Sequence, residues 1–146
     1  MLGYYKNPDA TAAAMTPDGW LKTGDLGVID RDGFIFIRGR SKTMILSSNG
    51  QNIYPEEIES ILGTLPYVTE SLIVQRPEGL VALILPDRDR AEKDGLDAAA
   101  LQTTMADNLR QLNSRIPRYC TVSAVELRDE PFEKTPKQSI KRYLYK

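Results

Sequence analysis

The chain has 146 residues, of which 41% are hydrophobic and 27% charged, and its formal net charge is −1. These proportions are ordinary for a globular protein, and the balanced charge gives no support for a nucleic-acid-binding protein. With no histidine and one cysteine, a His-based catalytic triad is excluded and we predict no metal site. No apolar run approaches the ~20 residues that span a bilayer. We therefore predict no transmembrane segment and a cytoplasmic location, leaving peripheral membrane association open.

The first 40 residues predict one short helix and several strands. Asn7 is a typical N-cap and Pro8 a typical first residue of a helix, which we expect to end near Met15. Three stretches predict strands: residues 20–23, 26–29 and 34–37. We expect this β-meander to keep an apolar side that the rest of the chain covers poorly.

Residues 43–62 predict a small hairpin followed by a helix. The Asn49-Gly50 pair favours positive φ and so marks a tight turn. Strands are expected on either side of the turn, at residues 43–48 and 51–53. Pro55 fits the first turn of a helix, where a missing N–H costs nothing, and Gly63 is a plausible stop.

The remaining residues predict a small mixed sheet with flanking helices. Further strands are expected at residues 71–75, 80–85 and 121–127. Between them, residues 87–95 predict a charged loop, and Asp97 can cap a long helix that Pro117 ends. The apolar stripe of that helix is Leu101, Met105, Leu109, Leu112 and Ile116. With residues 131–146 as a basic tail, residues 41–146 predict an α+β domain.

Three motifs occur in one order along the first 60 residues. They read Gly-Tyr-Tyr-Lys-Asn-Pro-Asp-Ala-Thr at residues 3–11, Trp-Leu-Lys-Thr-Gly-Asp at residues 20–25, and a longer stretch at residues 39–59. Together they resemble the adenylate-forming (AMP-binding) enzymes, the superfamily of acyl-CoA synthetases, luciferases and peptide-synthetase adenylation domains. The sequence of residues 48–59 is most similar to that of long-chain fatty acyl-CoA ligases. It reads Ser-Asn-Gly-Gln-Asn-Ile-Tyr-Pro-Glu-Glu-Ile-Glu.

The resemblance implies the C-terminal portion of a larger enzyme. Residues 1–40 would be the end of an N-terminal adenylation domain, as a β-rich fragment, and residues 41–146 a mobile C-terminal α+β domain. In the family the phosphate loop and the acyl pocket lie upstream, so we expect this fragment alone to be inactive. ATP, coenzyme A and Mg²⁺ would be bound mainly by that upstream domain.

The implied activity is that of an ATP-dependent, AMP-forming fatty acid–CoA ligase. A carboxylate attacks the α-phosphate of ATP to give acyl-adenylate and pyrophosphate, and the thiol of coenzyme A then displaces AMP. The expected partners are a fatty acid, ATP and coenzyme A, with no nucleic acid. Two alternatives stay open: an adenylate-forming enzyme with another acceptor, such as an acyl- or peptidyl-carrier protein, and a non-catalytic α+β interaction module.

Three residues match nucleotide-binding positions of the family. Asp25 matches the carboxylate that accepts hydrogen bonds from the ribose hydroxyls. Arg40 matches the arginine that contacts the nucleotide. Ile37 lies near a position that packs against the nucleotide. The residues alone allow plainer interpretations: a turn aspartate, a solvated arginine at the end of a strand and a core isoleucine.

Two further positions match mobile parts of the family fold. Lys42 matches the hinge residue, about which the C-terminal domain rotates between the half-reactions. Ser48, Asn49, Gly50 and Gln51 match the turn that enters the coenzyme A channel, where a glycine lets the backbone approach the pantetheine closely. An exposed lysine and a plain hairpin turn are the alternatives, and the second is compatible with the channel role.

The tail departs from the family pattern. Relatives carry Thr-Pro-Thr-Gly-Lys-Ile-x-Arg, whose lysine bridges the carboxylate and the α-phosphate, whereas residues 135–142 read Thr-Pro-Lys-Gln-Ser-Ile-Lys-Arg. This alignment puts Ser139 at the lysine position. Lys137 or Lys141, two residues to either side, is the candidate replacement, and the alternative is that both are solvated tail charges.

Overall fold

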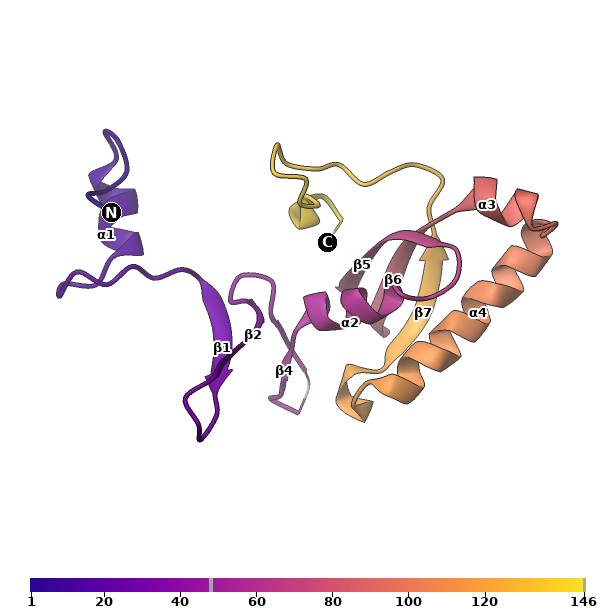
Figure 1. The fold of residues 1–146 in the computed structure, drawn as a ribbon, viewed down its shortest axis with the longest axis horizontal. Coiled ribbons are helices and arrows are strands. Elements are labelled where there is room, and N and C mark those ends of the chain that lie inside the picture. The colour runs from indigo at the N-terminus through magenta and orange to yellow at the C-terminus, as the bar shows by residue number, and fades with distance from the viewer. Residues whose placement is uncertain (48, 146) are drawn as a thin grey trace. The chain divides into compact units, whose positions relative to one another are not determined.

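The computed structural model describes residues 1–47 and 49–145 (Figure 1). The chain divides into two compact units, Met1–Thr43 and Met44–Lys146. Helices and strands are intermixed along the sequence, and the larger unit contains a small mixed sheet with flanking helices. This confirms the predicted α+β fold class.

The first unit consists of a short helix and a two-stranded hairpin. Helix α1 (Pro8–Ala14) begins at Asn7, whose side chain accepts a hydrogen bond from the Ala10 N–H, as predicted for an N-cap. Strand β1 (Asp25–Ile29) pairs antiparallel with β2 (Ile35–Arg40).

The strand predicted at residues 20–23 is wrong. Leu21 forms an isolated bridge with Met15, and the chain turns at Gly24 before β1 begins. Gly24 has φ +79°, in the left-handed region that favours glycine, so the extended stretch cannot run on into β1. Its apolar residues, Trp20 and Leu21, are exposed.

The hairpin of the first unit keeps its apolar residues on the surface, as expected. Its exposed side chains include Val28, Ile29, Phe34, Ile35, Phe36 and Ile37. Within the described chain, the buried hydrophobic residues all lie at or beyond Ile53. The core of the molecule is therefore the core of the second unit.

The second unit begins with the predicted hairpin and helix. Strands β3 (Ile45–Leu46) and β4 (Asn52–Ile53) pair antiparallel, and α2 (Pro55–Leu62) follows directly. Pro55 occupies the first turn and Gly63 caps the C-terminus, as the sequence predicts. The α2 residues that face the core are Pro55, Ile58 and Leu62.

A three-stranded sheet forms the centre of the second unit. Strand β6 (Gly79–Pro86) lies between β5 (Val68–Arg76), which is antiparallel to it, and β7 (Val122–Leu127), which is parallel. Because parallel neighbours need a crossover connection, the chain passes through α3 (Arg88–Lys93), α4 (Ala98–Arg115) and the short 3₁₀ helix η1 (Arg118–Cys120) between β6 and β7.

The prediction of a charged loop at residues 87–95 is wrong, because these residues contain α3. Asp87 caps this helix by accepting a hydrogen bond from the Arg90 N–H at 3.1 Å, and Ala91 is its one buried residue. Gly95, with φ +79°, follows its end. An almost wholly charged exposed surface hid the helical period that would have predicted this element.

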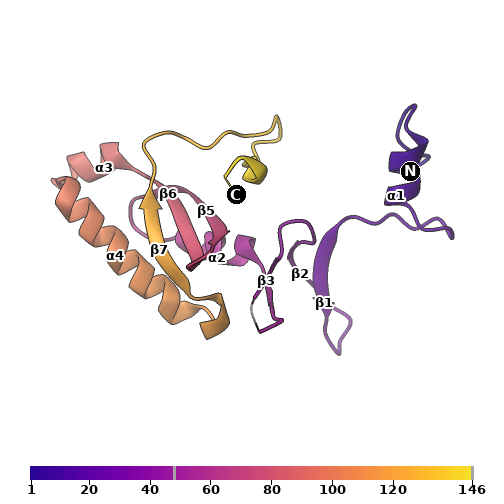
Figure 2. The same ribbon diagram turned by 180° about the vertical axis from the view of Figure 1, so that it is seen from behind.

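Each face of the sheet has its own apolar cluster. Helices α2 and α4 cover one face, and α2 lies in front of the strands in Figure 1 and behind them in Figure 2. The predicted α4 stripe is confirmed at its buried positions, which are Leu101, Met105 and Leu112. The opposite face places Leu72, Val74, Val81 and Leu83 against Phe132 from the tail.

Truncation of Leu112 is expected to lower the free energy of unfolding by about 2–5 kcal/mol. The side chain is 0% exposed at the contact between α4 and the sheet, so Leu112→Ala removes apolar burial and leaves a cavity. Urea denaturation followed by circular dichroism measures the change. The exposed neighbour offers a control, since Gln111→Ala is expected to stay within about 0.5 kcal/mol.

Candidate functional site

The first unit brings two predicted nucleotide-binding residues together. Asp25 and Arg40 are partners in the β1–β2 ladder, and Arg40 Nε lies 2.9 Å from Asp25 Oδ1. Arg40 Nη1 also donates to the Thr23 carbonyl at 3.0 Å. The Asp25 side chain is 31% exposed, and an ionised carboxylate has about four acceptor positions, so the ion pair leaves room for ligand hydroxyls.

Ile37 lies on the same hairpin but is not a core residue of this chain. It pairs with Gly27, two positions along β1 from Asp25, and is 66% exposed. The plain core interpretation therefore finds no support within the chain, and a contact with a flat apolar ligand remains a prediction.

Lys42 lies next to the boundary between the two units. The Thr43 N–H donates to the Arg40 carbonyl at 3.2 Å, so residues 40–43 form a turn that contains Lys42 on its exposed side. The division between units falls directly after this turn, between Thr43 and Met44. A few residues at the end of an element are the usual place for a hinge.

The predicted coenzyme A turn is an exposed hairpin tip. The Gly50 N–H donates to the Ser47 carbonyl at 3.0 Å, and the Gln51 N–H donates to Ser47 Oγ at 3.0 Å. Gly50 has φ +74°, and a Cβ added there would meet nothing within 4 Å, so the backbone is open to a ligand. Asn49 is exposed at the same tip, and Ser48 lies outside the described residues.

The tail folds into a hairpin instead of extending into solvent. Lys134 and Ile140 form an antiparallel bridge, and the Thr135 N–H donates to the Ser139 carbonyl at 2.8 Å. At the tip Gln138 has φ +62°, a left-handed conformation that favours glycine. The family pattern has glycine at this point, immediately before its lysine. The backbone therefore supports the alignment that puts Ser139 at the lysine position.

Lys137 and Lys141 occupy different parts of this hairpin. Lys137 is exposed at the tip, beside Ser139. Lys141 lies on the returning arm, where its Nζ is 3.1 Å from Glu133 Oε2, and this pairing raises the pKa of the Lys141 ammonium. Of the two lysines, Lys137 is the one that the hairpin presents together with Ser139.

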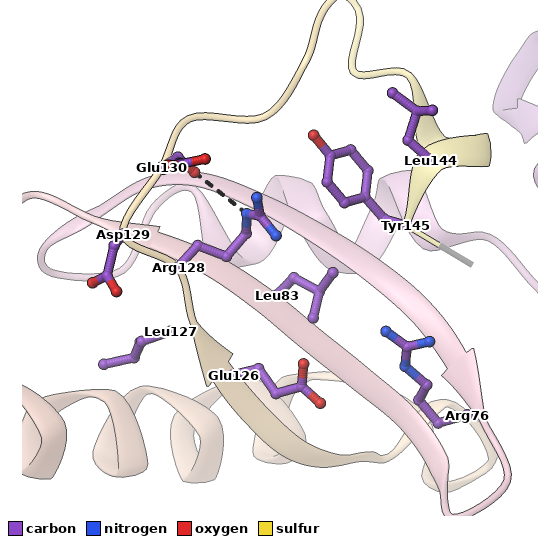
Figure 3. A pocket seen from close by; sticks show the side chains of 9 residues that line it. All are labelled: Arg76, Leu83, Glu126, Leu127, Arg128, Asp129, Glu130, Leu144 and Tyr145. Atoms are coloured by element: carbon purple, nitrogen blue, oxygen red, sulfur yellow. Dashed lines mark hydrogen bonds between the residues drawn. The ribbon is translucent and has the colours of Figure 1, made fainter.

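An aromatic and cationic cluster holds the tail against the sheet. The Phe132 and Tyr145 rings meet edge to face with centroids 5.1 Å apart, and Tyr145 Oη accepts from the Glu133 N–H at 2.7 Å. The Arg128 guanidinium lies 4.9 Å from both ring centroids, at the edge of an open groove on the sheet (Figure 3). The basic composition of the tail does not predict this packing. The aromatic residues Phe132 and Tyr145 are the sequence features that could have indicated it.

Two carboxylates of the second unit anchor the tail, and sequence reasoning did not assign either to that role. Glu59 of α2 pairs with Arg142, and Glu70 of β5 pairs with Lys134. Both partners lie more than 60 positions away along the chain. Spacing within a helix or a strand cannot reveal pairs of this kind.

Comparison with known proteins places the chain in a family. Residues 42–145 match the family described as AMP-binding enzyme C-terminal domain. The chain belongs to this family. It is 35% identical over 144 residues to 2-methylpropanoate–CoA ligase of Humulus lupulus, covering 99% of the chain and 25% of that protein. It is 37% identical over 135 residues to indoleacetate–CoA ligase of Aromatoleum aromaticum, covering 89% of the chain and 24% of that protein.

The chain is also similar to solved structures. ATP-bound MatB from Rhodopseudomonas palustris matches with a TM-score of 0.70 and 27% identity, covering 97% of this chain and 27% of that chain. The Mycobacterium tuberculosis fatty acyl CoA synthetase matches with a TM-score of 0.57 and 26% identity, over 97% and 26% of the two chains. The chain thus spans about a quarter of the length of the proteins it matches.

Neither a metal cluster nor a membrane span is found in the described part of the chain. Within residues 1–47 and 49–145, no three His, Cys, Asp or Glu side chains lie together so as to hold a metal ion. No described helix combines the length and the apolar character needed to cross a membrane.

Proposed function

We propose that this chain is the C-terminal part of an ATP-dependent, AMP-forming acid–CoA ligase, with the upstream adenylation domain ending near residue 40. Membership of the AMP-binding C-terminal family carries the proposal, together with relatives whose names are those of acid–CoA ligases. The Asp25–Arg40 pair adds support from geometry, because it is a carboxylate and a planar guanidinium held on neighbouring strands.

In this proposal, the residues of the first unit bind the nucleotide and the tail acts on the reacting groups. Asp25 accepts the ribose hydroxyls, Arg40 holds that carboxylate and reaches the nucleotide, and Ile37 packs against it. Lys137 supplies positive charge where the carboxylate and the α-phosphate meet. The family resemblance implies Mg²⁺, which takes oxygen ligands. Among residues 1–47 and 49–145 no three His, Cys, Asp or Glu side chains lie together, and in this proposal the ion is held mainly by the upstream domain.

The second half-reaction uses the other face of the same domain. Rotation about Lys42 would withdraw the tail hairpin and bring the tip at Asn49, Gly50 and Gln51 to the reaction centre. Gly50 would then line the path of the pantetheine thiol, because its backbone is open. A carrier protein as acceptor is the competing hypothesis, and the choice of thiol in the assay below distinguishes the two.

The acid substrate of the proposed ligase is inferred from the sequence of residues 48–59. The wording of residues 48–59 favours a long-chain fatty acid, and we propose palmitate as the first substrate to assay. The relatives are named for other acids, among them 2-methylpropanoate, indoleacetate and sulfoacetate. The assay therefore takes the complete gene product, ATP and each of these acids, and measures AMP release and thioester formation with coenzyme A. Lack of both with every acid would overturn the proposed function.

Asp25→Asn is expected to raise the KM for ATP by about 10- to 100-fold, because hydrogen bonds to a charged acceptor contribute about 1.5–3 kcal/mol. Steady-state kinetics of the complete gene product measures the change. Asp32→Asn, in the exposed turn of the same hairpin, is the matched control and is expected to leave the KM unchanged. Equal effects of the two substitutions would remove Asp25 from the nucleotide site.

A further inference from the structure

The returning arm of the tail is fixed by a charge cluster on α2. Arg142, in the 3₁₀ helix η2 (Arg142–Leu144), forms an ion pair and hydrogen bond with Glu59, and its Nη2 lies 3.7 Å from Glu56 Oε1. The Glu59 and Arg142 side chains are 15% and 23% exposed. An ion pair this sheltered keeps a definite geometry, unlike the exposed pairs on the surface.

Glu59 also ties this cluster to the central sheet. Its Oε1 accepts a hydrogen bond from the Ile73 N–H of β5 at 2.7 Å, while its other oxygen faces Arg142. One carboxylate therefore connects α2, β5 and the tail. Burial raises the pKa of Glu59 to about 7, Arg142 and the Ile73 N–H act to lower it, and the nearby Glu56 adds to the rise. A buried charge is retained only where partners of this kind offset its desolvation.

The outgoing arm of the tail is fixed by a second carboxylate. Glu70 of β5 accepts from the Phe132 N–H at 3.3 Å and forms an ion pair with Lys134. Carboxylates of α2 and β5 thus hold both arms of the hairpin. The tip begins at Thr135, the residue after Lys134. The position of the tip is set by contacts at the base of the hairpin.

We propose that Glu59 is a positioning residue for the adenylation half-reaction, acting through Arg142 to fix the hairpin whose tip carries Lys137 and Ser139. The inference rests on the proposed function, which gives the tip its task. It extends that function by assigning a role to a carboxylate that touches neither substrate nor reacting atoms. Small displacements of a reacting group cost large factors in rate, so a loosened base lowers the rate of the first half-reaction alone.

A first experiment tests the positioning without any activity. Amide hydrogen exchange is measured on the 146-residue chain for Thr135, Gln138 and Lys141, whose N–H groups bond within the hairpin. At about pH 8, above the Glu59 pKa of about 7, Glu59→Gln keeps an acceptor for the Ile73 N–H but removes the charge that faces Arg142. We expect exchange of the three amides to rise about tenfold, while amides of β6 keep their protection. Unchanged exchange in the tail would overturn the proposal.

The matched control is an exposed ion pair elsewhere in the same unit. Asp107 pairs with Arg110 on the outer surface of α4, and both side chains are more than half exposed. Asp107→Asn removes one carboxylate charge, as Glu59→Gln does, and is expected to leave exchange of the tail amides at the wild-type rate. A rise in both variants would assign the effect to net charge, and the positioning role would fall.

A second experiment separates the two half-reactions in the complete gene product. In Glu59→Gln we expect ATP–pyrophosphate exchange to lose about tenfold in kcat with the KM for ATP within about twofold, and thioester formation from preformed acyl-adenylate to be unchanged. Arg142→Gln should give the same loss, the double variant no further loss, and Arg142→Lys a partial recovery. Equal losses in both half-reactions would indicate a purely structural role. Wild-type protein without exchange would refute the proposed function, while the tail amides would still report the positioning.

Discussion

Ser139→Lys is expected to raise the rate of ATP–pyrophosphate exchange by about 100-fold in the complete gene product. The proposed alignment of the tail puts Ser139 at the lysine position of the family pattern, and the left-handed Gln138 beside it supports this alignment. A serine offers no charge to the carboxylate and the α-phosphate as they approach, whereas an ammonium at this point stabilises the charge that develops between them. The hairpin tip is exposed, so the longer side chain finds space without repacking.

A companion variant separates the effect of side-chain length at position 139 from the effect of charge. Ser139→Gln lengthens the side chain without adding charge and is expected to leave exchange near the wild-type rate. If Ser139→Lys gives no more than Ser139→Gln, the alignment of the tail with the family pattern is wrong. Thioester formation from preformed acyl-adenylate is expected to be the same in all three proteins, since the proposed function uses the tip only in the first half-reaction.

The same assay tests whether Lys137 or Lys141 takes the role that the family pattern gives to its lysine. Lys137→Ala is expected to lower exchange about tenfold or more, because Lys137 shares the tip with Ser139. Lys141→Ala is expected to change it by less than about twofold, since Glu133 already holds that ammonium on the hairpin arm. If the double variant exchanges pyrophosphate at the wild-type rate, neither lysine has the role.

Local sequence signals predicted the elements whose causes are local. Asn7 and Asp97 cap helices through their own side chains, each accepting from an N–H three residues on, and such contacts need no information from elsewhere. The Asn49-Gly50 turn and the apolar stripe of α4 are of the same kind. These features follow from short spacings, so the sequence alone was sufficient for them.

The errors arose where the apolar pattern of the sequence did not match the structure. Helix α3 buries only Ala91, so its amphipathic period was nearly absent. At residues 20–23 an apolar run suggested a strand, but the pairing of β1 with β2 begins only at Asp25, after the left-handed Gly24. In both cases the competing signal was a cap or a glycine at the boundary.

The candidate site was predictable as residues but not as an arrangement. Motifs identified Asp25 and Arg40, yet only the register of β1 and β2 makes them an ion pair. The folding of the tail depends on Glu59 and Arg142, which are 83 positions apart. A charged tail without its partners is indistinguishable from a solvated one, so the hairpin and its anchors could not be foreseen.

Glu59 is expected to make the free energy of unfolding fall as pH rises from about 4.5 to 7. In the folded chain burial raises the pKa of Glu59 from 4.5 to about 7, so between these values the folded state binds more protons than the unfolded state. The contribution of Glu59 is therefore fully present below about pH 4.5 and is lost as pH rises through 7. The shift corresponds to about 3 kcal/mol, measured as the difference between wild type and Glu59→Gln in urea denaturation at about pH 5 and pH 8.

Arg142 provides the test of cause, because its charge lowers the pKa of the Glu59 carboxyl against the larger effect of burial. Arg142→Gln should therefore move the titration of Glu59 upward, which carboxyl carbon NMR measures directly, and extend the loss of stability above pH 7. Asp107→Asn is expected to leave that titration unchanged, since its exposed pair with Arg110 lies on α4. If Arg142→Gln leaves the titration of Glu59 where it is in wild type, Arg142 does not act on that carboxyl, and the clamp between α2, β5 and the tail is open in solution.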